Sequence, residues 1–337
     1  MVRAGRLGAI VLAGLTCGVP ARASMVINIV SSGADALTGN ALAVAQNAAN
    51  AWASLFSNDI TINVQMSFAD LGSGVLGSAS TAETTLSYSQ VYGSLRAEAG
   101  QSGKGALANL PGNSTLLNTT LPSGYSVANT GGVPNLTLAT ADAKALGYSV
   151  GVASDGTIEM AKSYYSGWAS GDTTGAFDYE SVVIHEIGHV LGFISSEDTV
   201  DYDLQQNNPS AIFLTPLDLL RFSGGLPGDF MNTLRDLSPT TGAQVLSDGV
   251  VAYSVCTGAY YGSGCQASHW TDTSPAIGVM QYALPGGTVQ GITSADIWAM
   301  EMIGYDLAVP EPGTVVFLAT GLAVLAILRR RRSPRSV

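Results

Sequence analysis

The stretch Asp178-Tyr179-Glu180-Ser181-Val182-Val183-Ile184-His185-Glu186-Ile187-Gly188-His189-Val190-Leu191-Gly192 contains the pattern His-Glu-x-x-His, which decides how we interpret the whole fold. His185 and His189 are four residues apart, so on a helix they lie on one face, one turn from each other. Two imidazoles at this spacing can bind one zinc ion. Glu186 stands beside the first of them and can take a proton from an attacking water molecule. The stretch therefore predicts a helix that carries two zinc ligands and a general base.

The ends of this stretch favour a helix. Asp178 can cap its N-terminus, and Glu180 lies in the first turn, where the helix dipole favours a carboxylate. Gly192 can end the helix in the left-handed conformation. The apolar residues that would bury it are Val182, Val183, Ile187, Val190 and Leu191. The alternative is a chance match, because short motifs also occur on ordinary core helices. Two of the three histidines of the chain lie in this stretch, which favours a metal site.

The charge of the chain excludes some partners. Its 337 residues can form one large domain or two. Between residues 24 and 308, six basic residues stand against 24 acidic ones, which gives a formal charge of about −18. Such a body repels polyanions at long range, which argues against nucleic acid and anionic membranes as partners. Few charges and many glycines are typical of a loop-rich secreted protein.

Residues 1–23 are predicted to be a secretory signal peptide. Arg3 and Arg6 form its basic start, Leu7 to Val19 its apolar stretch, and Ala21-Arg22-Ala23 an A-x-A cleavage site. A membrane anchor is the alternative. The apolar stretch is short for that, and Gly and Thr interrupt it.

The C-terminal end, residues 309–337, contains a second targeting signal. Pro310-Glu311-Pro312 precedes an apolar run over residues 314–328, which is predicted to span a membrane, and four arginines follow. This order resembles the PEP-CTERM sorting signal of Gram-negative bacteria. The resemblance implies transient insertion in the inner membrane, removal of the tail by a processing enzyme of the exosortase type, and a final place at the cell surface or outside the cell. A permanent anchor is the alternative.

Hydrophobic periodicity gives the elements of the body. Strands are expected at Met25–Val30 and Ile60–Phe68, a glycine-rich loop or weak edge strand at Gly72–Ser80, and an edge strand near the active-site helix at Gly156–Ala161. Helices are expected at Ala41–Phe56, Ser89–Ala99, Thr140–Leu146 and Ile292–Gly304. The aromatic residues of the first helix belong to the core. Residues 100–135 are rich in Gly, Asn, Ser, Thr and Pro and are expected to form a surface loop.

The third zinc ligand decides which zinc proteins the chain resembles. A catalytic zinc keeps three protein ligands and one open position. Gly192 and Phe193 extend the motif to H-E-x-x-H-x-x-G-F, which resembles the metzincin metalloproteases. Most of these place a third histidine three residues after the glycine. Ser195 occupies that position here and is a poor ligand.

His269 is the remaining histidine. It precedes Trp270, and Met280 follows eleven residues after it. This arrangement resembles the leishmanolysin branch of the metzincins, in which an insertion separates the glycine from the third histidine and a Met-turn follows. The resemblance covers residues 24–308. It implies one catalytic Zn²⁺ held by His185, His189 and His269, with Glu186 as general base of an endopeptidase that acts on proteins or peptides.

The resemblance also implies an α+β, zincin-like fold. Residues 24–192 would form an N-terminal subdomain with a twisted sheet, helices and the active-site helix. Residues 193–308 would form an irregular C-terminal subdomain ending in a helix. An edge strand above the cleft would pair with extended substrate backbone.

The segment Gly278–Tyr282 is the expected Met-turn. Met280 would form a polarizable apolar floor under the imidazoles. Tyr282 resembles the tyrosine of the Met-x-Tyr motif in astacin-like and serralysin-like metzincins, where it can approach zinc and stabilise the oxyanion. Leishmanolysin-like enzymes are not known for this tyrosine, and a core or supporting position is the alternative.

Cys17 lies in the predicted signal peptide and would be removed with it, which leaves Cys256 and Cys265. They are nine residues apart in a glycine-rich segment, and export to an oxidising compartment favours a disulfide over two free thiols. This disulfide would fasten the loop that delivers His269.

Two further interpretations stay open. The chain can be a non-catalytic zinc-binding protein of the cell surface or the biofilm matrix, although such a site has no need of Glu186. Within the enzyme class, Asp198 or Asp201 can replace His269 as the third ligand.

Overall fold

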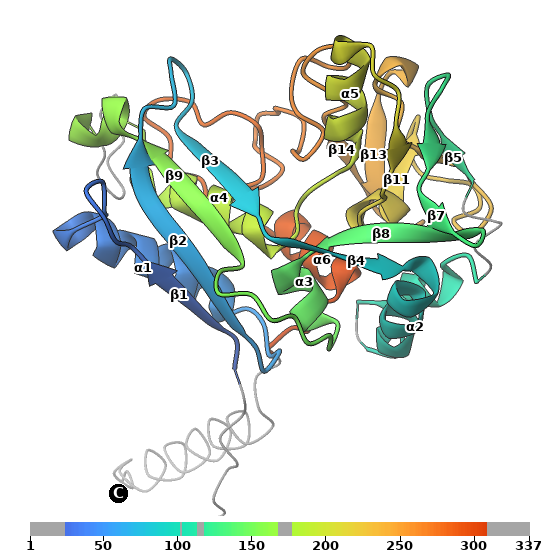
Figure 1. Cartoon of the computed structure of the whole chain (residues 1–337), viewed down its shortest axis with the longest axis horizontal. Coiled ribbons are helices and arrows are strands. Elements are labelled where there is room, and N and C mark those ends of the chain that lie inside the picture. The colour runs from blue at the N-terminus through green and yellow to red at the C-terminus, as the bar shows by residue number, and fades with distance from the viewer. Residues whose placement is uncertain (1–23, 102, 113–117, 168–176, 309–337) are drawn as a thin grey trace, which may run out of the picture.

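The computed structural model describes residues 24–101, 103–112, 118–167 and 177–308 (Figure 1). The predicted signal peptide and the predicted sorting tail with its membrane span lie outside these residues. Within the described ranges, no helix combines the length and the apolar character that a membrane span needs.

A four-stranded sheet forms the N-terminal part of the fold, in the order β1 (Val26–Val30), β2 (Thr61–Ala69), β9 (Gly156–Ala161), β3 (Gly77–Thr81). The first three strands are parallel, and β3 runs antiparallel to β9. The strict alternation of residues 60–68 predicts β2, and its alternate side chains Ile62, Val64 and Met66 are buried.

One strand prediction is wrong. Residues 156–161 form a strand at the predicted bounds, but β9 lies between β2 and β3 and is not an edge strand. The edge strand is β3, which lies in the glycine-rich segment 72–80 that is equally consistent with a loop. The order of strands depends on contacts between distant segments, which local sequence does not encode.

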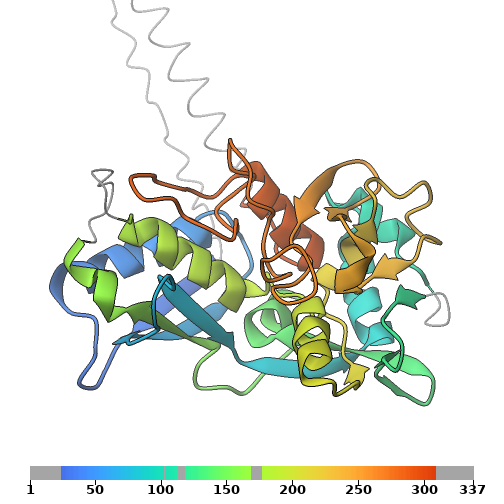
Figure 2. The ribbon, with the colours of Figure 1, turned by 90° about the horizontal axis from the view of Figure 1, so that it is seen from above.

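Two helices cover one face of this sheet (Figure 2). They are α1 (Gly39–Ala53) and α4 (Tyr179–Leu191). Trp52 of α1 is fully buried, and its indole N–H donates to the carbonyl oxygen of Ile184 in α4 at 2.9 Å. Phe56 is buried as well. The predicted core role of this aromatic pair is therefore confirmed.

The segment 100–135 is not a plain surface loop. It contains the short helix η1 (Gly105–Asn109) and the strands β5 (Thr119–Thr120), β6 (Ser126–Val127) and β7 (Asn129–Thr130), and it reaches the start of β8 (Val133–Ala139). Lys104, Leu107 and Leu110 are buried. Strand β5 pairs with β12 (Arg235–Asp236), and β6 pairs with β10 (Ala211–Ile212). The polar composition of this segment gives no sign of these strands, because their partners lie about 85 to 115 residues later in the chain.

The rest of the fold consists of small sheets and helices, so the predicted α+β class is confirmed. A second sheet has the order β4 (Glu83–Ser87), β8, β7, and a third the order β11 (Arg221–Ser223), β13 (Gln244–Ser247), β14 (Ala252–Val255). The remaining helices are α2 (Tyr88–Glu98), α3 (Thr140–Ala145), η3 (Lys162–Gly167), α5 (Glu197–Gln206), η4 (Leu217–Leu220), η5 (Pro239–Thr241) and α6 (Ser294–Ile303). The division into subdomains at residue 192 stays a prediction.

Asp142 of α3 is a buried carboxyl group in this core. It is 1% exposed, and neither of its oxygens has a hydrogen-bond partner among the described residues. Burial, and to a lesser extent the nearby Glu98 carboxylate, raises the pKa of Asp142 well above its usual value. The folded protein therefore favours the neutral form of this group.

We expect Asp142→Asn to stabilise the protein increasingly as the pH rises. In the unfolded chain the group ionises near its ordinary pKa of 3.8, whereas the folded state keeps the proton to higher pH. The folded state thus binds more protons above pH 3.8, and its stability falls as the pH rises through this window. At pH 8 the variant should be the more stable protein in urea unfolding by at least about 1 kcal/mol, because asparagine has no proton to lose and escapes the pH-dependent destabilisation of the wild type. The exposed Asp59→Asn variant should show no such gain, and an equal gain in both would contradict the expectation.

Candidate metal centre

Helix α4 places the first two histidines. Its N-cap Asp178 accepts hydrogen bonds from the backbone N–H and the hydroxyl of Ser181, at 2.9 and 2.6 Å. The helix ends at Gly192, which has a φ of 117°. Both helix ends are therefore as predicted. His185 and His189 lie one turn apart, with ring centroids at 4.8 Å.

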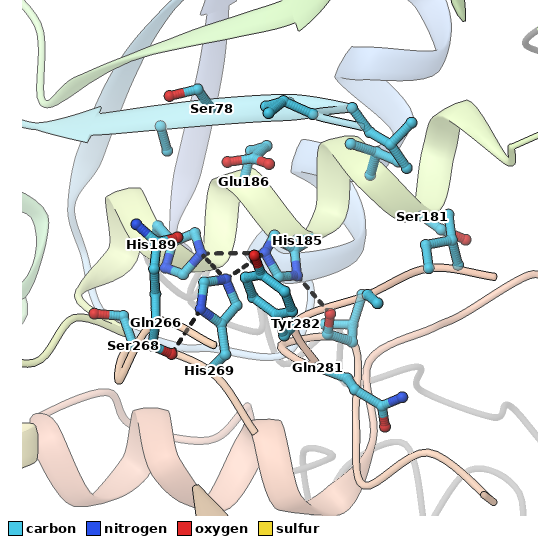
Figure 3. Close-up of a pocket in the computed structure, with 18 of the residues that line it drawn as sticks. Ser78, Ser181, His185, Glu186, His189, Gln266, Ser268, His269, Gln281 and Tyr282 are labelled. Carbon is cyan, nitrogen blue, oxygen red and sulfur yellow. Dashed lines mark hydrogen bonds between the residues drawn. The ribbon is translucent and has the colours of Figure 1, made fainter. Parts of the chain in front are cut away.

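His269 meets these two histidines, although it lies 84 residues after His185 (Figure 3). The Nε2 atoms of His185 and His189 are 3.1 Å apart, and each is 3.2 Å from the Nε2 atom of His269. In the described part of the chain, these three residues form the one group whose ligand atoms lie close enough to share a metal ion. The predicted convergence of the three rings is confirmed.

The other ring nitrogens fix the protonation of the three imidazoles. Each Nδ1 atom lies within hydrogen-bond distance of a carbonyl oxygen, which only accepts, so each Nδ1 carries the proton. The acceptors are Val279 for His185 (2.8 Å), Phe193 for His189 (2.8 Å) and Gln266 for His269 (3.1 Å). Every Nε2 atom of a neutral ring then presents a lone pair to the same point.

Three converging lone pairs repel one another unless a cation lies between them. A tetrahedral zinc ion holds imidazole nitrogens at 2.0–2.1 Å, which separates the nitrogens by about 3.3 Å. The observed separations of 3.1 to 3.2 Å fit this requirement. The three histidines can therefore hold one metal ion.

Burial keeps the site in the form that binds metal. It lowers the pKa of His185 and lowers the pKa of His189 to about 3; burial and the two neighbouring rings lower the pKa of His269 well below its usual value. All three rings stay neutral near pH 7.

Glu186 lies next to this cluster, under the edge strand β3. Its side chain is 6% exposed, and burial raises its pKa to about 8. It makes no hydrogen bond within the described ranges. A Cβ atom at Gly77 of β3 would come within 2.6 Å of its Oε1 atom. The position of the Glu186 carboxyl group therefore requires glycine at residue 77.

Asp198 and Asp201 do not join the metal cluster. Asp198 accepts the backbone N–H groups of Ala267 and Ser268, at 2.6 and 3.0 Å. Asp201 accepts the backbone N–H groups of Tyr260 and Tyr261, both at 2.8 Å. Both carboxylates thus hold the segment that leads to His269, so they support the third ligand and do not replace it.

A disulfide and a buried arginine hold the same segment. Cys256 and Cys265 form the predicted disulfide, with Cα atoms 5.5 Å apart. Arg221 is fully buried and donates to the carbonyl oxygens of Cys256 and Ala267, at 3.1 and 2.6 Å. Glu197 balances its charge at 2.7 Å. Arg221 therefore binds both ends of the segment between the first cysteine and the third histidine.

Asp296 organises the Met-turn, which sequence reasoning missed. Its Oδ1 atom accepts the indole N–H of Trp270 at 2.8 Å, and its Oδ2 atom accepts the backbone N–H of Val279 at 2.9 Å. Oδ2 also caps α6 through the backbone N–H of Thr293. The Thr-x-x-Asp pattern predicts only the cap. A Cβ atom at Gly278 would lie 2.3 Å from this carboxylate, which explains the glycine.

Met280 and Tyr282 flank the cluster. Met280 is fully buried, and its sulfur fills the space beside Gly188, between the two helix histidines. It therefore packs against α4, and its role as a floor under the imidazoles stays a prediction. Tyr282 is 44% exposed, with its ring 5.3 Å from that of His269. It lines the cavity and does not belong to the core.

A cavity of about 540 Å³ opens over the histidines. Strand β3 forms one wall, α4 the floor, and the segments around His269 and Tyr282 the opposite wall (Figure 3). Comparisons with family models, with curated proteins and with solved structures found no match to this chain. The interpretation of the site therefore rests on its own residues.

We expect Gly188→Ala to destabilise the protein, against the usual trend in helices. Alanine normally stabilises a helix interior by up to about 1 kcal/mol relative to glycine. Here the new Cβ atom would lie 2.2 Å from the sulfur of Met280, and overpacking costs roughly 1–3 kcal/mol. The matched control is Gly93→Ala in α2, where no atom lies within 4 Å of the new Cβ atom. Thermal unfolding should show a lower Tm for the first variant and an equal or higher Tm for the second; the reverse order would contradict this packing.

His269→Ala should weaken zinc binding by more than a hundredfold. Loss of a residue that merely supports a ligand usually costs 10- to 100-fold in affinity, and loss of a ligand should cost more. Asp201→Asn should keep one ion per molecule, because Asp201 binds backbone and not the metal. Competition titration with a chromogenic chelator measures both. Unchanged affinity in His269→Ala, together with lost binding in Asp201→Asn, would reverse the ligand assignment.

Proposed function

We propose that this protein is an exported zinc-dependent endopeptidase that resembles the leishmanolysin branch of the metzincins. The observation that carries the proposal is the convergence of three unprotonated Nε2 atoms beside a buried glutamate in an open cavity. The sheet with an antiparallel edge strand, the helix α4, the turn at Met280 and the last helix α6 also agree with a zincin-like fold.

The donor set favours zinc over the common hard cations. Mg²⁺ and Ca²⁺ prefer oxygen ligands, whereas three neutral imidazoles suit zinc. When bound, the ion would act as a Lewis acid on the scissile carbonyl group. Three protein ligands leave a position open for substrate, which is typical of catalytic and not of structural zinc.

Glu186 is the proposed general base. With the charge of a bound zinc ion lowering its pKa, it would take a proton from the attacking water molecule and pass it to the leaving nitrogen. Its buried carboxyl group has no other partner among the described residues. A structural zinc site does not require such a group, so Glu186 argues against a non-catalytic surface or matrix protein. Tyr282 lines the same cavity with its ring beside that of His269, and its hydroxyl group is the proposed hydrogen-bond donor to the developing oxyanion.

Strand β3 is the proposed binding edge for substrate. It is the last strand of its sheet, and residues 74–79 line the cavity. Its free edge can pair with the backbone of an extended protein or peptide, which positions one peptide bond beside Glu186.

The two ends of the chain suggest where this peptidase would act. A signal peptide at residues 1–23 and a PEP-CTERM-like tail at residues 309–337 fit export and a place at the cell surface after processing by an exosortase-type enzyme. The membrane would be a transient partner through residues 314–328.

Glu186→Gln should abolish peptidase activity and keep the metal. Loss of a general base typically lowers the rate by 10² to 10⁴-fold, whereas the three histidines are unchanged. Cleavage of a quenched fluorescent peptide, with and without chelator, measures the rate, and metal analysis measures zinc. The control is Glu159→Gln on the exposed face of β9, which should keep full activity. Undiminished turnover in Glu186→Gln would refute the role of Glu186.

A further inference from the structure

A second cavity adjoins the one over the histidines. It has a volume of about 340 Å³ and lies between β4 and the segment that follows α4. Ile194 lines both cavities, so they are neighbours at this residue.

One extended segment of chain lines both cavities. After Thr81, the last residue of β3, the chain passes through Ala82 directly into β4 (Figure 1). Alternate residues of an extended chain face the same side. Gly77 faces Glu186, so Thr81 and Glu83 also face the cleft.

The free edge of this segment is continuous as well. Both β3 and β4 lie at the end of their sheets. The N–H of Ala82 donates to the carbonyl oxygen of Asp155 at 2.9 Å, and its carbonyl oxygen accepts the N–H of Thr140 at 2.8 Å. The N–H and C=O of one residue in an antiparallel ladder point to the same side. The partners of both strands therefore lie on one side, and among the described residues no backbone group pairs with the opposite edge from Gly77 to Leu86.

Glu83 gives the second cavity its charge. Its carboxylate oxygens accept the hydroxyl groups of Thr81 and Thr137, at 3.3 and 3.1 Å, which hold it at the cavity wall. It forms no ion pair with any residue in the described ranges. The other polar side chains lining this cavity carry hydroxyl groups: Thr85, Thr137, Ser195, Ser196, Thr199 and Thr215.

Neither cavity has a Lys or Arg among its described lining residues. The proposed zinc ion offsets the acidic groups of the first cavity, so the electrostatic preference comes from the second, where Glu83 is the one charged residue among the described lining residues. The body of the chain is strongly acidic in addition. The second cavity therefore attracts a cationic side chain and repels an acidic one.

We propose that the second cavity is a substrate subsite for a basic side chain, with Glu83 as the residue that determines this preference. This inference rests on the proposed peptidase function. Glu83 lies six residues after Gly77, which is about 20 Å along an extended strand. A peptide paired with the free edge would reach Glu83 with a residue about six positions from the cleaved bond. Antiparallel pairing, the commoner kind, places this residue on the N-terminal side.

The test uses a series of peptides in which a single lysine occupies, in turn, each position from the fourth to the eighth before the cleaved bond. Each lysine peptide is compared with a peptide that has glutamine at the same position. A truncated peptide lacks these positions. We expect kcat/KM to rise about threefold for lysine near the sixth position, the scale of an exposed ion pair, and the rise should fade in 0.5 M NaCl. Glu83→Gln should lose the preference and cleave the truncated peptide at the wild-type rate, while Glu159→Gln should keep it.

The outcomes separate this inference from the peptidase function. Equal cleavage of all lysine and glutamine peptides, or an unchanged lysine preference in Glu83→Gln, would overturn the role of Glu83 and leave the peptidase intact. A preference found only on the C-terminal side would overturn the placement of the peptide. If the wild-type protein with bound zinc fails to cleave even the truncated peptide, the proposed function falls and the subsite with it.

Discussion

The structure depends on three imidazole nitrogens that present lone pairs to one point. This arrangement exists because the Nδ1–H of each ring donates a hydrogen bond to a backbone carbonyl oxygen, which leaves Nε2 unprotonated. Without a cation it is unfavourable, since three acceptors face one another in a buried site. The carbonyl groups that orient the rings come from residues after α4, before His269 and within the Met-turn. The ring orientations therefore link three separate parts of the chain to one ion.

Buried charges near the site serve mainly to hold backbone in place. Arg221 and Asp198 bind the segment before His269, and Asp296 binds the turn that contains Met280. A buried ion is costly to desolvate unless hydrogen bonds satisfy it, and each of these groups makes several. These hydrogen bonds restrain the backbone on either side of His269. A small shift of this backbone would move the third imidazole away from the other two.

Local patterns predicted the parts of the site that lie on one element. The spacing in 178–192 was sufficient for α4 with its caps, and the scarcity of histidine was sufficient to select His269. The order of β9 and β3 was not predictable, because a glycine-rich strand has the composition of a loop. The reason for its glycine at residue 77 is the contact with Glu186, which only the structure shows. Residues 100–135 were misjudged for a similar reason. Lys104 is buried there between Glu98 and Asp306, and the second partner lies 202 residues later. Asp296 was missed because its local pattern explains a helix cap and nothing more.

The clamp on the segment before His269 has an entropic consequence. Bringing together residues 84 positions apart requires the closure of a long loop, whose cost grows with the logarithm of its length. In small zinc-dependent domains the ion itself must offset that cost, and such domains unfold without metal. Here Asp198, shortly after α4, accepts the backbone N–H groups of Ala267 and Ser268, and Arg221 contacts both Glu197 and Ala267, so protein contacts close most of this loop. Contacts within the protein therefore offset part of this entropic cost before any ion binds.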